Sequence, residues 1–336
     1  MRALICKEPF NLNYEELDIP SPLKGETLLQ IKRIWICGTD LHAFEGTQPF
    51  FKYPVILGHE LAATIVETDA PGFAKGESVT ILPYFNCGQC IACRMGKPNC
   101  CVNMKVFGVH TNGGMREFVT VPSSNLIQGQ GLAFDELALV EPLAIGVHAI
   151  SRAQVRPDEF VLVVGAGPIG LGIMEFLKIA GANVIAMDVN NNRLQFCKKQ
   201  IGVPFSINPL EENALECLKT ITSNDMPTVI FDATGNRNAI NNAFQFLSHG
   251  GRYVLVGLQT GEIVFSHPEF HKREATLMSS RNATTKDFDM VIEAIKNKKV
   301  KPGIYITHRV SFDNIKTEFA NWLVPENGVI KTMVSF

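Results

Sequence analysis

Residues 160–170 read FVLVVGAGPIG, and this stretch decides the fold of the second half of the chain. An apolar run is followed by glycines at 165, 167 and 170, where a helix is expected to begin. The first glycine permits a tight turn, the second lets the backbone approach a pyrophosphate, and the third allows the helix to pack closely on the strand. The N-terminus of a helix also attracts phosphate. The stretch therefore predicts a dinucleotide-binding site.

An acidic residue follows at the spacing that such a site requires. Asp188 ends the next apolar run, NVIAMD, about 20 residues further on. An acid there accepts hydrogen bonds from ribose hydroxyls and repels a 2′-phosphate, which favours NAD over NADP. Arg193 lies close enough to keep NADP open. The predicted cofactor-binding residues are Gly165, Gly167, Pro168, Ile169, Gly170, Asp188, Arg193 and Thr234.

The pattern of apolar and polar residues changes twice along the chain. Between 150 and 283, apolar runs alternate with helical stretches, which predicts a parallel sheet covered on both faces. Residues 1–149 instead contain short alternating segments, such as 28–33, 61–67 and 78–82, which predict an irregular β domain. After a helix at 287–298, strand-like segments near 304–310 and at the C-terminus resemble the first region. The predicted class is α/β plus β, with domains at 1–149 plus 284–336 and at 150–283.

Composition limits the classes of function. A chain of 336 residues exceeds the roughly 250–300 that one core usually serves, so two domains are expected. The net charge of -2 gives no basic excess that would suggest nucleic acid or an anionic membrane. No signal peptide and no apolar run of about 20 residues is visible, so we expect a cytoplasmic protein.

Cysteines cluster between 87 and 101. The spacing Cys87-x2-Cys90-x2-Cys93-x7-Cys101 offers four thiolates within one loop, and Cys100 is a fifth candidate. Four thiolates form a closed tetrahedral zinc shell, typical of a structural site. A zinc ribbon that contacts DNA would need more flanking basic residues than Arg94, Lys97 and Lys105. The segment 84–106 is therefore predicted to be a structural zinc lobe, with the fourth ligand left open between Cys100 and Cys101.

Three more segments of the first region contain residues that bind metals. They are CGTDLH at 37–42, GHE at 58–60 and EPL at 141–143. Each has a structural explanation when taken alone, such as a buried thiol or an acid that begins a helix. Together, Cys37, His59 and the acids Glu60 and Glu141 predict a catalytic zinc with an open coordination position.

The order of these motifs resembles the zinc-containing medium-chain alcohol dehydrogenase family over essentially the whole chain. The resemblance implies a GroES-like catalytic domain with an inserted Rossmann domain of doubly wound parallel sheet. It implies NAD, two zinc ions per chain, and Cys101 rather than Cys100 as the fourth structural ligand. The glutamate at 141 replaces a cysteine of the classical branch and resembles the polyol and sugar-acid branch. Whether Glu60 or Glu141 contacts the metal stays open.

The resemblance also implies roles in proton transfer and substrate binding. Thr39 would take the proton of the substrate hydroxyl, and His42 would pass it to solvent; His42 as a plain surface residue is the alternative. Segments such as 46–54 resemble enzymes that oxidise a secondary hydroxyl of an aldonate. The carboxylate of an aldonate needs a basic side chain to bind it. Arg281 is the first candidate, and the others are Arg116, Lys52 and His110.

Three rival functions fit these residues less well. A zinc-free quinone reductase would lack the cysteine lobe and the pair Cys37 and His59. A non-catalytic NAD-sensing protein would need no Thr39 and His42. A sorbitol- or L-threonine-type dehydrogenase is the alternative within the same family. Relatives imply a homodimer or homotetramer, and no nucleic-acid or membrane partner is expected.

Overall fold

A computed structural model of the chain describes residues 1–48 and 51–336. It contains two compact units, residues 1–141 with 283–336 and residues 142–282. This division falls between Glu141 and Pro142, inside helix α4 (Val140–Ala153), whereas the change in sequence pattern lies a little further on. None of the helices in the described part of the chain has the length and apolar composition of a membrane span.

The first unit is built mainly from antiparallel strands. Its largest sheet has the order β10-β6-β5-β3-β18-β17, and β9 also pairs with β3. The strands of this sheet are β3 (Glu26–Trp35), β5 (Glu60–Glu67), β6 (Ser78–Ile81), β9 (Phe118–Pro122), β10 (Leu126–Gln128), β17 (Ile306–Ser311) and β18 (Lys331–Ser335). Smaller sheets contain β1 (Arg2–Glu8), β2 (Asn11–Glu16) and β4 (Val55–Ile56), and β7 (Tyr84–Phe85) with β8 (Lys105–Val106).

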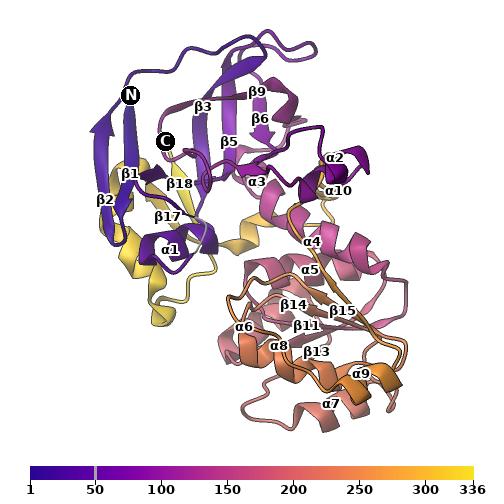
Figure 1. Cartoon of the computed structure of the whole chain (residues 1–336). Helices are drawn as coiled ribbons and strands as arrows, with labels where there is room; N and C mark the ends of the chain where they lie inside the picture. Colours follow the sequence, from indigo (N-terminus) through magenta and orange to yellow (C-terminus); the bar gives the residue numbers. More distant parts are fainter. Residues whose placement is uncertain (49–50) are drawn as a thin grey trace. The chain divides into compact units, whose positions relative to one another are not determined.

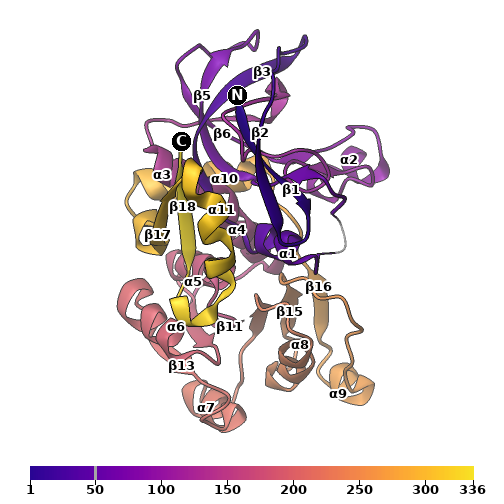
Figure 2. The same ribbon diagram turned by 90° about the vertical axis from the view of Figure 1, so that its left-hand side faces the viewer.

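The C-terminal segment lies within this sheet. β18 pairs antiparallel with β3 through Met333 opposite Trp35, and parallel with β17. In Figure 2 the yellow C-terminal strands can be followed into the sheet of the indigo and purple strands. The helices of this unit are α1 (Gly38–Glu45), α2 (Ile91–Arg94), α3 (Phe134–Leu137), α10 (Thr285–Lys296) and α11 (Ile315–Glu318), with short helical turns η1 (Pro98–Cys100), η2 (Ser123–Asn125), η5 (Pro302–Tyr305), η6 (Phe312–Asn314), η7 (Phe319–Leu323) and η8 (Pro325–Asn327).

The second unit is a parallel sheet with the order β13-β12-β11-β14-β15-β16. This is the strand order of a Rossmann fold, in which the direction of winding reverses between β11 and β14. The strands are β11 (Phe160–Val164), β12 (Asn183–Met187), β13 (Phe205–Ile207), β14 (Val229–Asp232), β15 (Arg252–Leu255) and β16 (Thr276–Ser279). The helices are α5 (Pro168–Ile179), α6 (Asn191–Phe196), α7 (Ala214–Ile221), α8 (Arg237–Ala243) and α9 (His267–Lys272), with η3 (Cys197–Ile201) and η4 (Phe244–Phe246).

The core of this unit explains why the apolar runs form strands. Leu162, Ile185, Ile230 and Tyr253 lie on neighbouring strands and are fully buried in one cluster. In Figure 1 helices cover the sheet on both sides, as continuous apolar runs predict. The predicted class of α/β plus β is therefore confirmed. Strands β13 and β16 were not anticipated, because each is short and only partly buried.

Two predicted elements differ from the structure at their ends. The helix expected at 287–298 is α10, which begins earlier because Thr284 caps it. The Asp287 carboxylate accepts hydrogen bonds from the Thr284 amide at 2.8 Å and hydroxyl at 2.7 Å. The strand expected from 304 begins only at Ile306, since the preceding residues form η5 with Pro302 in its first turn.

Candidate active site and cofactor site

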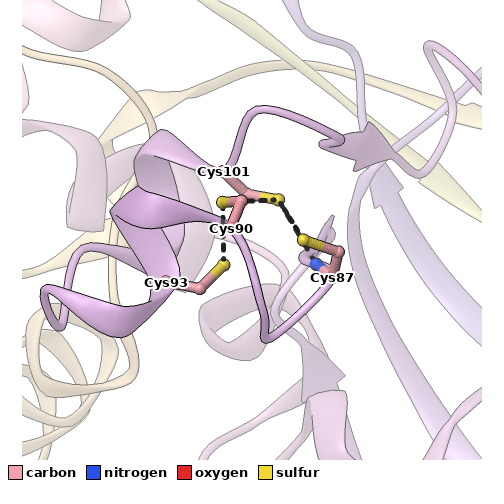
Figure 3. A group of neighbouring side chains, drawn as sticks. All are labelled: Cys87, Cys90, Cys93 and Cys101. Carbon is pink, nitrogen blue, oxygen red and sulfur yellow. Dashed lines mark hydrogen bonds between the residues drawn. The ribbon is translucent and has the colours of Figure 1, made fainter.

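The four-cysteine lobe is the loop between strands β7 and β8, and Figure 3 shows its four cysteines. The sulfur atoms of Cys87, Cys90, Cys93 and Cys101 point toward one another, and all lie within 4.8 Å. The Sγ–Sγ distance is 3.5 Å from Cys90 to Cys93, 3.9 Å from Cys90 to Cys101 and 3.5 Å from Cys101 to Cys87. The edge of a tetrahedron with Zn–S bonds of 2.3 Å is about 3.8 Å. The lobe thus fits a four-thiolate zinc.

Backbone amides donate hydrogen bonds to the sulfur atoms of this lobe. The amide of Cys87 donates to Cys101 Sγ at 3.3 Å, and that of Val102 donates to Cys90 Sγ at 3.5 Å. Hydrogen bonds from the amides of Gln89 and Cys90 lower the pKa of Cys87 to about 6. Thiolate is the form of cysteine that binds zinc. Cys100 is exposed and lies outside the group, whereas Cys101 is buried within it.

A second group of ligand atoms lies in the buried part of the first unit. One ligand atom each of Cys37, His59 and Glu60 lie within 4.8 Å of one another. Cys37 precedes α1, and His59 and Glu60 lie at the start of β5, next to β3. Glu60 Oε1 is buried and has no hydrogen-bond partner among the described residues, whereas His59 Nδ1 lies 3.7 Å from a carboxylate oxygen of Asp40. Buried polar atoms without partners are costly, so a cation at this place fits the residues present.

Asp40 fixes the geometry of this group. Its carboxylate is fully buried and accepts hydrogen bonds from the amide of Cys37 at 2.9 Å and from the amide of Gly58 at 3.0 Å. It therefore ties together the two backbone segments that carry Cys37 and His59.

Charges surround the buried ligands. Burial lowers the pKa of His59, but Cys37 and Asp40 outweigh it and hold this pKa well above its usual value. Burial raises the pKa of Cys37, and it raises that of Glu141 to about 7. Metal binding favours the deprotonated ligands against these effects, because a cation stabilises thiolate and carboxylate.

Glu141 and Glu60 differ in their partners. Glu141 begins α4, lies outside the 4.8 Å group, and accepts a hydrogen bond from the hydroxyl of Tyr84. Glu60 Oε2 forms a buried ion pair with Lys331 on β18, so only Oε1 is left for a metal. The sequence left open which acid contacts the metal, and the structure places Glu60 nearer to Cys37 and His59.

Thr39 and His42 lie on α1, the helix that begins directly after Cys37. Thr39 is half-buried, whereas His42 is exposed. His42 Nδ1 lies 3.3 Å from a carboxylate oxygen of Glu45 and 3.4 Å from the hydroxyl of Thr47. The geometry is compatible with a proton exit at the surface.

The cofactor site lies at the carboxyl ends of the parallel strands. A cavity of about 890 Å³ is lined by the predicted residues Gly165, Gly167, Asp188, Arg193 and Thr234. Pro168, Ile169 and Gly170 instead form the first turn of α5. The sequence missed other residues of the cavity, which follow β13 and β14: Leu210, Glu212, Asn213, Asn236 and Asn238. Their position after strand ends is the signal that could have indicated them.

The surroundings of Gly167 and Gly170 agree with the roles predicted for these glycines. A Cβ at Gly170 would lie 1.8 Å from the carbonyl oxygen of Gly165, so no larger residue fits. A Cβ at Gly167 would meet no described atom within 4 Å, which leaves its backbone open to a ligand. Asp188 Oδ2 accepts the amide hydrogen of Ala166 at 2.6 Å and so ties the acid to the glycine turn. These residues fit a nicotinamide dinucleotide.

Comparisons with known proteins agree with this geometry. Residues 23–131 match the alcohol dehydrogenase GroES-like domain, and residues 168–297 match the zinc-binding dehydrogenase domain. L-galactonate-5-dehydrogenase of Escherichia coli K12 is 40% identical over 338 residues, which cover 100% of this chain and 99% of that protein. The chain belongs to the zinc-binding alcohol dehydrogenase family.

Other members of the family extend the comparison. L-threonine 3-dehydrogenase of Pyrococcus horikoshii is 34% identical over 271 residues, covering 78% of this chain and 77% of that protein. The crystal structure of an Escherichia coli CFT073 alcohol dehydrogenase with NADH matches with a TM-score of 0.92 and 30% identity, covering 100% of this chain and 99% of that one. This chain is therefore a dehydrogenase whose family uses zinc and a nicotinamide cofactor, and the predicted GroES-like and Rossmann architecture is confirmed.

The alcohol dehydrogenase contains two site residues that the sequence did not indicate. Tyr84 and Lys331 lie far from Glu141 and Glu60 along the chain, yet their side chains contact these acids. Neither belongs to a motif with metal-binding spacing, so only the fold identifies them.

The four basic residues that were candidates to bind the substrate carboxylate lie in different surroundings. The Arg116 side chain is half-buried and donates to the carbonyl of Gly113 at 3.0 Å; burial lowers its pKa to about 10. Arg281 is exposed at the end of the second unit. Lys52 and His110 line one cavity of about 430 Å³. Within the segment 46–54, residues 49 and 50 lie outside the described residues.

Proposed function

We propose that this dehydrogenase oxidises a secondary hydroxyl of an aldonate to a ketone, with L-galactonate as the first candidate and NAD as the hydride acceptor. The observation that carries the proposal is the group of Cys37, His59 and Glu60, in which three kinds of metal ligand converge and Glu60 Oε1 is buried without a hydrogen-bond partner among the described residues. The identity of 40% to L-galactonate-5-dehydrogenase over the whole chain supports the choice of substrate class.

The residues divide the chemistry between them. Cys37, His59 and Glu60 would hold the catalytic zinc, and the four-cysteine lobe would hold the structural one. Bound zinc supplies a Lewis acid for the hydroxyl that is oxidised. The Thr39 hydroxyl accepts the proton of that hydroxyl and releases its own proton toward the surface, where His42 passes a proton to solvent. The bond to hydrogen on the same carbon breaks as hydride leaves for the nicotinamide.

We further propose that Lys52 and His110 bind the carboxylate of the substrate. His110 Nδ1 accepts the amide hydrogen of Val106 at 3.0 Å, which orients the ring in the cavity that His110 and Lys52 line. The loop with His110 packs against the residue before His59. A Cβ at Gly113 would lie 2.5 Å from the carbonyl oxygen of Gly58, so this close approach requires glycine. The loop is thereby fixed next to a candidate metal ligand.

The test compares substrates that differ in one group. Galactitol has the hydroxyl pattern of L-galactonate but lacks its carboxylate, so a carboxylate site predicts a much lower kcat/KM for galactitol. NADH formation is measured on L-galactonate, galactitol, L-threonine, sorbitol and L-idonate. Lys52→Met and His110→Gln should each raise KM for L-galactonate and leave the rate with galactitol unchanged. Turnover of sorbitol or L-threonine without turnover of aldonates would replace the proposal with that activity.

NAD preference has its own test. Asp188→Ser, combined with an arginine supplied nearby, should shift preference toward NADP, because the acid no longer repels a 2′-phosphate. Unchanged NAD preference would contradict the role of Asp188. Arg281→Ala tests the remaining substrate candidate in the same assay.

Assembly is also a proposal. β16 is the last strand of the six-stranded sheet, and an edge strand can pair with a second copy. We expect a homodimer or homotetramer in light scattering, and a monomer at working concentrations would contradict it.

A further inference from the structure

Tyr84 connects two parts of the first unit that the sequence keeps separate. It lies on β7, which pairs with β8 through Tyr84 opposite Val106 and Phe85 opposite Lys105. The amide of Phe107 extends this pairing by donating to the carbonyl of Pro83 at 2.9 Å. The four cysteines lie in the loop between these two strands. We call β7 and β8 the stem of the cysteine lobe.

The Tyr84 side chain leaves the stem and contacts Glu141, whose pKa is affected by burial and by the nearby charges of His59 and Glu60. Its hydroxyl donates a hydrogen bond to Glu141 Oε1, and both residues are only 4% exposed. A buried tyrosine hydroxyl needs a polar partner, and a carboxylate acceptor makes the hydrogen bond stronger than a neutral one. Glu141 lies in the first turn of α4, and this hydrogen bond ties its carboxylate to the stem.

The stem depends on the cysteine lobe for its own order. It is only two residues long on each side, and a two-stranded hairpin is marginally stable by itself. The loop that it closes is largely exposed apart from Cys101 and Asn99, and even its large apolar side chains Ile91, Met95 and Val102 are exposed. A metal that joins the four sulfurs across this loop would hold the two strands of the stem together.

We propose that Tyr84 is a positioning residue that couples the four-cysteine lobe to the catalytic metal site. Zinc in the lobe orders the stem, the stem fixes Tyr84, and the Tyr84 hydroxyl holds Glu141 beside His59 and Glu60. Loss of the lobe metal therefore weakens metal binding at the catalytic site without any change in Cys37, His59 or Glu60. This inference rests on the proposed catalytic zinc, but it does not depend on which alcohol is the substrate.

The test measures metal retention in the full-length zinc-loaded protein. Release of zinc to a competing chromogenic chelator is followed, and Cys37→Ala identifies the phase that belongs to the catalytic site. Tyr84→Phe removes only the hydroxyl and should lower the affinity of that phase about 10-fold, since loss of a hydrogen-bonding group in the outer shell of a metal site typically costs 10- to 100-fold. Tyr14→Phe is the matched control, because the Tyr14 hydroxyl donates to the carbonyl of Phe312 in the same unit. Equal retention in Tyr84→Phe and wild type would overturn the proposal.

A second variant tests the coupling itself. Cys93→Ser removes one sulfur of the lobe and should also weaken the catalytic phase in the wild-type background. In the Tyr84→Phe background, Cys93→Ser should lower the affinity of the catalytic phase little further. Tyr84→Phe has already removed the contact between the stem and Glu141, and substitutions that act through one contact are non-additive. Full additivity would overturn the coupling. Should Cys93→Ser fail to fold, Asn103→Ala gives a milder change, since the Asn103 amide donates to Cys87 Sγ at 3.7 Å.

The outcomes separate this inference from the proposed function. Metal release needs no substrate, so an enzyme inactive on every aldonate could still show the effect of Tyr84→Phe. An active aldonate dehydrogenase with equal metal retention in both tyrosine variants would retain the proposed function and lose the inference.

Discussion

The cysteine lobe and the catalytic group are both candidate zinc sites, yet they are built in opposite ways. The lobe takes its four sulfurs from residues 87–101, a single loop, and backbone amides donate to them. The catalytic group takes Cys37 from the start of α1 and His59 and Glu60 from the start of β5, and of these three residues only Cys37 is partly exposed. A closed shell of thiolates stabilises a fold, whereas a mixed and incompletely filled shell leaves a position for a substrate. The contrast separates a structural role from a chemical one.

The largest effect is expected where the two sites differ most, in turnover. Cys37→Ala or His59→Ala should lower kcat at least about a thousandfold, because a Lewis acid supplies several kcal/mol of barrier lowering. NADH binding, followed by fluorescence, should be unchanged, since the cofactor residues lie in the second unit. Retained turnover in either variant would contradict a catalytic role for zinc, and with it the functional difference between the two sites.

In the lobe, the expected effect is on stability. Cys90→Ser should lower the free energy of unfolding by about 3–5 kcal/mol, because the closed metal shell contributes to folding. Urea titration of the zinc-loaded protein measures it. Cys100→Ser is the matched control, since Cys100 is adjacent in sequence but exposed and outside the group. Equal damage from both substitutions would mean that the predicted fourth ligand is wrong.

The buried ion pair between Lys331 and Glu60 is a feature of the catalytic site that affects stability. The side chains of Lys331 and Glu60 are 3% and 1% exposed, so Lys331→Met leaves a buried carboxylate without its partner. We expect a loss of about 3–5 kcal/mol in the free energy of unfolding, and a smaller loss for Lys331→Arg, which keeps the charge. The double variant Lys331→Met with Glu60→Gln should recover much of the stability. A loss below about 1 kcal/mol in Lys331→Met would show that the pair is solvated.

The smallest effect concerns the surface end of the proton path. His42→Gln should lower kcat mainly below neutral pH, because at higher pH hydroxide in the solvent can take up the proton instead. The pH profile of kcat measures this, with His249→Gln, an exposed histidine of the second unit, as control. Identical profiles for His42→Gln and wild type would make His42 a plain surface residue.

Sequence alone predicted the parts of this protein that depend on local spacing. The glycines at 165, 167 and 170 and the four cysteines of one loop are close along the chain, so turn geometry and ligand number limit what they can do. The apolar runs likewise predicted the central strands of the parallel sheet. The short edge strands β13 and β16 gave no such signal, since little of either is buried.

The tertiary structure decided which distant residues meet. Nothing in the motif GHE indicates that Glu60 is paired with Lys331, and nothing in EPL indicates that Glu141 accepts a hydrogen bond from Tyr84. These contacts exist because β18 returns to β3 and because β7 follows β6 into the same buried region. A buried charge or hydroxyl must find its partner wherever the fold provides one, and that partner can lie anywhere in the sequence.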